Sequence, residues 1–175
     1  KSSNLTGLAA WSAVKGIEVI GTGDFTHPGW FRELRENLQP AEPGFFKLKD
    51  TNIPRILESV STTIAQCRFI LTAEIRSIYK GQGRVRKIHN ILFGPDFDSA
   101  SRINTRLASV GNIESDGRPI LGLDARDLLE IVLELAPDGF LVPAHIWTPW
   151  FSLFGSRSGF DSIDDCFGDL SRYIF

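Results

Sequence analysis

The sequence predicts an α/β protein with a mainly parallel sheet, built either as layers or as a barrel. Short apolar runs alternate with helix-like segments about four times along the chain, which is the order expected of repeated strand–helix–strand units. The composition is that of an ordinary globular protein, with 42% hydrophobic and 23% charged residues among 175. A chain of this length is sufficient for one domain with a substantial core.

The first half of the chain is expected to hold two helices, two short strands and a third helix. Leucine and alanine recur at helical spacing over 5–15, and 17–20 is a short apolar run typical of a buried strand. A short helix is predicted over 30–38, and the alternating segment 45–49 fits an exposed strand. Pro54, well suited to a first helical turn, predicts a helix that extends to residue 66.

The second half begins with a predicted hairpin. Strands over 69–74 and 84–93 flank Gly81-Gln82-Gly83, and a glycine-rich turn between two apolar runs favours an antiparallel pair. Helices are expected over 98–110, with Asp98 as the N-cap, and over 124–135, where leucine and valine form an apolar stripe.

Charge and hydropathy exclude several classes of protein. The net charge of −2 provides no overall attraction to nucleic acid, so binding of a polyanion requires local positive charge or metal ions. No apolar run is long enough to span a membrane, and residues 1–16 lack the continuous apolar stretch of a signal peptide. Two widely separated cysteines match no metal or disulfide spacing. We therefore expect a cytoplasmic protein that does not bind membranes.

Side chains of the types that bind metal ions occur near the ends of several predicted strands. The chain has only three histidines, His27, His89 and His145, and each lies near such a point. Glu74 closes another apolar run, and Asp24 shortly precedes His27. In α/β barrels the loops after the strands converge on one face, so these five side chains are candidate ligands of divalent ions. Taken alone, each histidine also fits a hydrogen-bonded structural residue, and that alternative stays open.

A basic run beside Glu74 and His89 indicates contacts with a phosphate backbone. No acidic residue interrupts it, and lysine and arginine supply most protein contacts with DNA phosphates. A hairpin whose charges are merely solvated is the alternative. The candidate DNA-binding residues of this run are Arg76, Lys80, Arg84, Arg86 and Lys87.

An aromatic loop over 146–162 follows a compact strand predicted over 139–143. It includes Trp147, Trp150 and Phe151, whose rings are suited to stacking on an extruded base. The same rings could instead close the mouth of a barrel. Other chemistries find no support, since the chain has no dinucleotide fingerprint, no GK[ST] phosphate loop and no Gly-x-Ser-x-Gly elbow.

Five segments spread along the chain carry a more specific signal. They are Gly-Thr-Gly-Asp-Phe-Thr-His-Pro (21–28), Leu-Thr-Ala-Glu-Ile (71–75), Lys-Ile-His-Asn (87–90), Ser-Asp-Gly-Arg-Pro-Ile-Leu-Gly-Leu-Asp-Ala-Arg (115–126) and Val-Pro-Ala-His-Ile-Trp-Thr-Pro-Trp-Phe-Ser-Leu-Phe-Gly (142–155). Together they resemble the endonuclease Q branch of the polymerase and histidinol phosphatase (PHP) superfamily. The resemblance implies part of a distorted (β/α)7 barrel of the TIM type. Residues 1–175 are then expected to be a single partial PHP domain, truncated at both ends, because the family's His-x-His and Ser-Asp-Ala-His motifs are not in this chain.

The resemblance also implies a function. Endonuclease Q enzymes are metal-dependent hydrolases that nick DNA on the 5′ side of deaminated bases or abasic sites, in DNA repair. By motif, Glu74 is the glutamate that bridges two metals, and Asp24 stands where most PHP relatives have histidine. Both are candidate catalytic residues, with His27, His89 and His145 as further ligands of two or three Zn, Mn or Mg ions. The alternatives are a PHP phosphoesterase acting on a small phosphomonoester and a non-catalytic barrel fragment.

Overall fold

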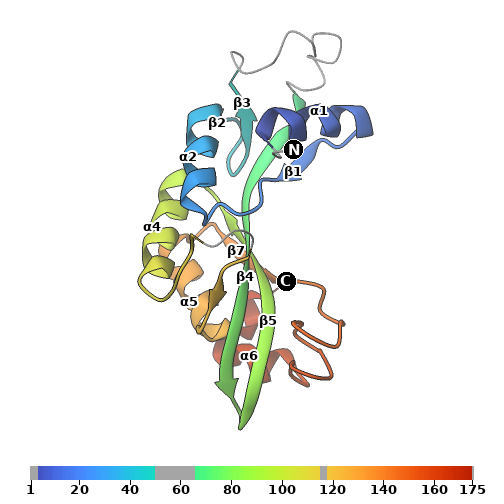
Figure 1. Ribbon diagram of the computed structural model, residues 1–175, viewed down its shortest axis with the longest axis vertical. Coiled ribbons are helices and arrows are strands. Elements are labelled where there is room, and N and C mark those ends of the chain that lie inside the picture. Colours follow the sequence, from blue (N-terminus) through green and yellow to red (C-terminus); the bar gives the residue numbers. More distant parts are fainter. Residues whose placement is uncertain (1–3, 50–65, 115–117, 175) are drawn as a thin grey trace.

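A computed structural model describes residues 4–49, 66–114 and 118–174. The molecule is elongated, and one long hairpin runs through most of its length (Figure 1). Its strands are β4 (Arg68–Gly81) and β5 (Arg84–Gly94), which pair antiparallel from Leu71 opposite Gly94 to Gly81 opposite Arg84. Gln82 and Gly83 form the turn, both at positive φ (52° and 76°), the backbone that a two-residue hairpin turn requires. The predicted hairpin is confirmed, and its first strand is longer than expected.

The predicted mainly parallel sheet of a TIM-type barrel is wrong. The sheet has the order β2-β3-β4-β5-β7, and all four of these neighbouring pairs are antiparallel. Only β1 and β6 pair parallel to β4, and within the described residues the sheet does not close on itself. The physical reason is the tight turn between β4 and β5, which forces the two longest strands to run in opposite directions. The shorter strands are β1 (Val19–Gly21), β2 (Leu38–Pro40), β3 (Phe46–Leu48), β6 (Ile120–Leu121) and β7 (Phe140–Pro143).

The helices lie close to their predicted positions. Each α-helix begins at a side chain that accepts a hydrogen bond from an amide of its first turn, which satisfies one of the amide groups left free there. The 3₁₀ helix over 168–173 has no such side-chain cap. For α4 this N-cap is Asp96 rather than the predicted Asp98, with Asp96 Oδ1 2.6 Å from the Ser99 amide. The predicted helix over 54–66 lies almost wholly outside the described residues. The helices are α1 (Leu5–Lys15), α2 (Pro28–Asn37), α4 (Phe97–Ala108), α5 (Ala125–Leu135), α6 (Ile163–Phe167) and the 3₁₀ helix η3 (Gly168–Tyr173). None of those within the described ranges is long and apolar enough to cross a membrane.

The two faces of the hairpin have different surroundings, because successive side chains of a strand point to opposite sides. On one face Ile75, Ile88 and Leu92 are fully buried in the core. This core also includes the inner stripes of α4 and α5, which lie together on one side of the hairpin (Figure 1). On the other face, Glu74 and Arg76 of β4 are only partly buried.

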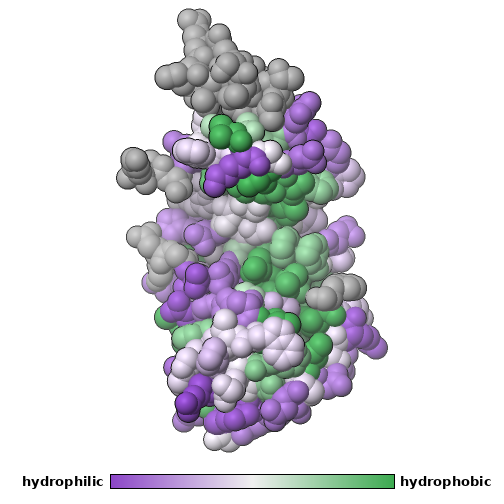
Figure 2. Space-filling view, turned by 90° about the vertical axis from the view of Figure 1, so that its right-hand side faces the viewer, coloured by the Kyte–Doolittle hydropathy of each residue, from purple (hydrophilic) through white to green (hydrophobic). Residues whose placement is uncertain are grey.

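The aromatic loop lies along the free edge of β5. Where β7 ends, the backbone of the loop continues the hydrogen bonding with β5. The amide of His89 donates to the Phe151 carbonyl at 3.0 Å, and the amide of Lys87 donates to the Ser158 carbonyl at 3.2 Å. Figure 1 shows this loop in orange on the side of the hairpin opposite α4 and α5, and Figure 2 shows a band of hydrophobic residues on the face seen from that side.

Candidate metal centre

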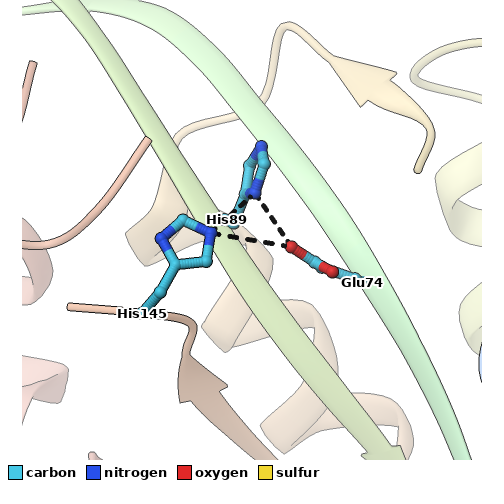
Figure 3. Close-up of side chains that lie close together, drawn as sticks. All are labelled: Glu74, His89 and His145. Atoms are coloured by element: carbon cyan, nitrogen blue, oxygen red, sulfur yellow. Dashed lines mark hydrogen bonds and ion pairs between the residues drawn. The ribbon is translucent and has the colours of Figure 1, made fainter. Parts of the chain in front are cut away.

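Three predicted ligands converge on one point. Oε1 of Glu74 lies 2.8 Å from Nδ1 of His89 and 3.9 Å from Nε2 of His145, and the two nitrogens are 3.1 Å apart. Figure 3 shows the three side chains pointing toward one another from β4, from β5 and from the loop after β7. Two imidazole nitrogens and a carboxylate oxygen form a donor set that suits zinc and other divalent transition metals. The residues therefore fit a divalent metal ion.

Strand pairing brings these ligands together. Arg76 is opposite His89, and Glu74 is opposite Ile91, so Glu74 and His89 are diagonal neighbours on the same face of the hairpin. His145 follows β7, and the Ala144 amide donates to the His89 carbonyl at 2.9 Å, which fixes the chain beside β5. Only His145 thus comes from a strand end. Glu74 and His89 lie in the middle of their strands, so the strand-end argument identified them for an incorrect reason.

Thr148 orients His145, and sequence reasoning missed it. The Thr148 hydroxyl donates to the Trp150 carbonyl at 2.8 Å and accepts from Nδ1 of His145 at 2.9 Å. With its proton on Nδ1, the neutral imidazole has a lone pair on Nε2, the atom that faces Glu74. His145 also has a positive φ of 32°, a strained backbone for a residue other than glycine. Such strain often accompanies functional sites, and Asp24 and Phe151 share it, with φ of 45° and 59°.

His89 is almost fully buried, with an exposed fraction of 4%, and stays neutral. Burial lowers the pKa of His89 to about 4, and the positive charges of Arg118 and Arg76 and the nearby His145 act in the same direction. Nε of Arg76 donates to Nε2 of His89 at 3.1 Å, and the Phe151 ring lies against the imidazole with centroids 4.8 Å apart. A neutral imidazole is the form that binds a metal ion. Because Nε2 accepts from Arg76, the ring proton lies on Nδ1, so Nδ1 would bind an ion only after the proton moved to Nε2 and Arg76 gave up this hydrogen bond.

A cavity of about 760 Å³ is lined by Glu74, one of the three candidate ligands. Glu74 and Arg76 line it from β4, Arg118 and Asn112 from the loop before β6, and Asp24 from the loop after β1. Asp24 therefore shares the cavity with Glu74, although it is outside the close group of three ligands.

His27 occupies a different position. It is the N-cap of α2, and its Nδ1 accepts from the Trp30 amide at 3.3 Å. This hydrogen bond is what a structural histidine makes. A role of His27 as a ligand remains a prediction.

The basic run divides between the two faces of the hairpin. Arg76 and Lys87 lie on the face of the three candidate ligands, whereas Arg86 lies on the core face with an exposed fraction of 2%. The Arg86 guanidinium donates to the Gly159 carbonyl and to Oε1 of Gln82, and it lies 3.9 Å from the centroid of the Phe160 ring. Arg86 thus holds the aromatic loop to the hairpin and is not accessible to a DNA phosphate. The alternation of apolar residues over 84–93 could have indicated that Arg86 is buried, because Arg86 and Ile88 are two residues apart and their side chains therefore point to the same face of the strand. Lys80 and Arg84 are exposed near the hairpin turn.

The aromatic residues also differ from one another. Trp147 is 76% exposed and Trp150 is 52% exposed, whereas Phe151 is half-buried against His89. Nζ of Lys87 lies 5.2 Å from the Trp150 ring, within the range of a cation–π contact. A second cavity of about 920 Å³ opens beside the loop and is lined mainly by apolar side chains, with His145 at its border.

Comparisons with known proteins add sequence and structural relatives. No protein-family model matches the chain. An uncharacterised protein of Methanocaldococcus jannaschii is 25% identical over 166 residues, which cover 94% of the chain and 16% of that protein. A crystal structure of the lesion-specific endonuclease PfuEndoQ from Pyrococcus furiosus matches with a TM-score of 0.70 and 29% identity, over 95% of the chain and 35% of that structure. A second structure, endonuclease Q in complex with a 27-mer duplex that has an abasic lesion at the active site, matches with a TM-score of 0.68 and 29% identity.

The match covers 97% of the chain in the DNA complex but only 37% of that endonuclease. The chain therefore spans about a third of the length of the solved structures that it matches and a smaller part of the curated relative. Over this span the similarity involves both fold and sequence, and it confirms the resemblance to the endonuclease Q family that the five motifs predicted.

Proposed function

We propose that the protein is a metal-dependent endonuclease of DNA repair that nicks the strand 5′ of a deaminated base or an abasic site. One observation carries this proposal: Glu74, His89 and His145 converge beside a cavity that two arginines line. The similarity to a lesion-specific endonuclease and to an endonuclease Q bound to a DNA duplex supports DNA as the substrate.

The three converging residues would hold a divalent ion of zinc, manganese or magnesium. Asp24, which lines the cavity with Glu74, is a candidate for holding a further ion, and His27 is a candidate from its sequence motif. Bound there, such ions supply Lewis-acid polarisation of a phosphate and activation of water. Among the protein's own residues, Glu74 provides the negative charge that draws cations to the centre. Thr148 keeps Nε2 of His145 unprotonated and directed at that centre. Asp24, across the cavity, is the second candidate catalytic carboxylate.

The surroundings of the centre fit an extended, negatively charged substrate. Arg76 lies next to His89, and Lys87 and Lys80 continue the positive charge along the same face of the hairpin toward its turn, where Arg84 is exposed on the other face. These side chains are placed to follow a phosphate backbone. Trp150 and Trp147 expose aromatic surface beside His145, on which an extruded base could stack.

A phosphoesterase acting on a small phosphomonoester is the second candidate. The observation that favours it is the bounded cavity, whose arginines would suffice for a single phosphate group. The exposed basic residues along the hairpin favour the DNA substrate, because a small phosphomonoester would not reach them.

The two functions are separated by a direct assay. The full chain, loaded with manganese or zinc, is incubated with duplexes that contain uracil, hypoxanthine or an abasic site, and with a phosphomonoester dye substrate. We expect a nick on the 5′ side of the lesion, no nick in an undamaged duplex, and no nick after chelation of the metal. Release of the dye without nicking would assign the site to the small phosphomonoester instead.

A further inference from the structure

Arg118 contacts the metal ligands in a way that the proposed function does not use. Its Nε lies 2.8 Å from Oε2 of Glu74. The other oxygen, Oε1, faces the imidazoles of His89 and His145. The carboxylate of Glu74 is therefore held between a guanidinium on one side and two metal-binding nitrogens on the other.

The residues that follow Arg118 pair with β4. The carbonyl of Pro119, the next residue, accepts from the Arg76 amide at 3.0 Å, and Ile120 pairs with Arg76 in the parallel ladder of β4 and β6. The chain directly after Arg118 thus lies beside β4. The side chain of Arg118 is 46% exposed and lines the cavity of about 760 Å³ together with Asp24 and Asn112.

The two arginines of the cavity each contact a metal ligand. Arg118 contacts Glu74, and Arg76 donates to His89. A guanidinium thus contacts the same carboxylate to which a divalent cation would bind. A cation bound to Glu74 would repel Arg118 and would weaken its attraction to the carboxylate, because charges this close interact strongly in a partly buried site.

We propose that Arg118 positions the phosphate group of the substrate, and that it exchanges Glu74 for a phosphate oxygen when a divalent ion binds. The guanidinium has several donors in a planar fork, which matches two oxygens of a phosphate. Once released from Glu74, it remains in the same cavity, close to the ions and able to contact a non-bridging oxygen. This inference rests on the proposed function insofar as the ligand is a phosphate ester.

The exchange predicts opposite changes in two affinities. Without Arg118 the carboxylate of Glu74 has lost a competing positive charge, so a divalent ion binds more tightly. The phosphate group has lost a donor, so it binds more weakly. Damage to the fold would instead weaken both, and this difference in sign identifies the mechanism.

The test uses Arg118→Gln, the charge-preserving Arg118→Lys, and Arg106→Gln as a control that removes an exposed arginine on α4 outside the cavity. Manganese affinity is measured by calorimetry without substrate. Binding of inorganic phosphate, and of a duplex with an abasic-site analogue, is then measured on the manganese-loaded protein. We expect Arg118→Gln to bind manganese several-fold more tightly and both phosphate ligands about tenfold more weakly. Arg118→Lys should lie between it and the unmodified protein, and Arg106→Gln should match the unmodified protein.

Weaker or unchanged manganese binding by Arg118→Gln would overturn the exchange, as would unchanged binding of inorganic phosphate. Failure of the proposed function has a different signature. If the two affinities change as expected but the unmodified protein does not nick lesion-containing DNA, the phosphate belongs to a small ester and the role of Arg118 stands. If the protein nicks DNA and Arg118→Gln alters neither affinity, only the role of Arg118 is lost.

Discussion

The two faces of the β4–β5 hairpin use the same kinds of residue for different purposes. Lys87 and Arg86 are neighbours in the sequence, yet Lys87 lies on the face of the metal ligands and Arg86 is buried on the core face. Burial of a charge is unfavourable unless it is hydrogen-bonded, and the Gly159 carbonyl and Gln82 side chain supply those bonds. The comparison teaches that the face to which a basic side chain points, rather than its charge, decides whether it can contact a substrate or stabilises the fold.

The largest expected effect is on the ligand face. Glu74→Gln should reduce lesion-dependent nicking by about 10³-fold or more, because the amide cannot replace the carboxylate charge that attracts the metal ions. Nicking kinetics under single-turnover conditions and metal analysis by mass spectrometry measure the two parts of this effect. The change should cost the fold little, since Glu74 is a partly exposed residue. Full metal content in the variant would show that Glu74 is not a ligand.

The next effect belongs to the core face. Arg86→Ala should lower the free energy of unfolding by about 3 kcal/mol, because it removes a buried guanidinium and leaves the Gly159 carbonyl to the longer hydrogen bond from Arg84, at 3.5 Å. Urea denaturation measures this change. Lys80→Ala, an exposed change in the same hairpin, should stay within about 0.5 kcal/mol of the unmodified protein. If the two variants had equal free energies of unfolding, Arg86 would not stabilise the fold more than the exposed Lys80 does.

A smaller effect is expected at Thr148, which lies outside the hairpin but orients a ligand. Thr148→Val keeps the shape of the side chain and removes the hydroxyl that accepts from His145. Metal affinity should fall about 10–100-fold, the usual range for loss of a group that orients a ligand. Thr148→Ser should restore it, and a calorimetric titration with zinc compares the three proteins. If serine fails to restore affinity, the methyl group rather than the hydroxyl is important.

The smallest effect is on DNA binding by Lys87, a partly buried basic residue on the face of the candidate ligands. Lys87→Gln should weaken binding of lesion and undamaged duplexes equally, and it should reduce the slope of log K against log[salt] by about 1. Filter binding at several salt concentrations provides this slope. An unchanged slope for Lys87→Gln would place Lys87 outside the DNA interface and confine the contacts to the cavity.

Local patterns predicted most elements, because capping residues and the Gly81-Gln82-Gly83 turn act over a few positions. The pairing of the other strands with this hairpin could not be predicted in this way. The parallel partners of β4, β1 and β6, are two or three residues long and come from opposite sides of it in the sequence. Such short strands have no periodicity of their own, so their pairing depends on tertiary contacts.

For the candidate site, the small number of histidines in the chain was informative. The predicted position of each residue at the end of a strand was not. Glu74, His89 and His145 were identified by residue type, but their convergence depends on the register of the hairpin, which the sequence pattern did not specify. Thr148 and Arg118 could not be found because their roles depend on contacts across loops. His27 differs from these residues, because its hydrogen bond from the Trp30 amide fits the structural alternative that the sequence left open, while its role as a ligand stays a prediction.

The backbone bonds between the aromatic loop and β5 also bear on solubility. Beyond the end of β7, the amides of Lys87 and His89 would form an open strand edge, which is a template for pairing with another molecule. Phe151 and Ser158 occupy these amides from within the same chain. Shortening the loop would therefore leave the edge of β5 unpaired and would also displace the candidate metal ligands. We expect such a variant to aggregate as well as to lose the candidate metal centre.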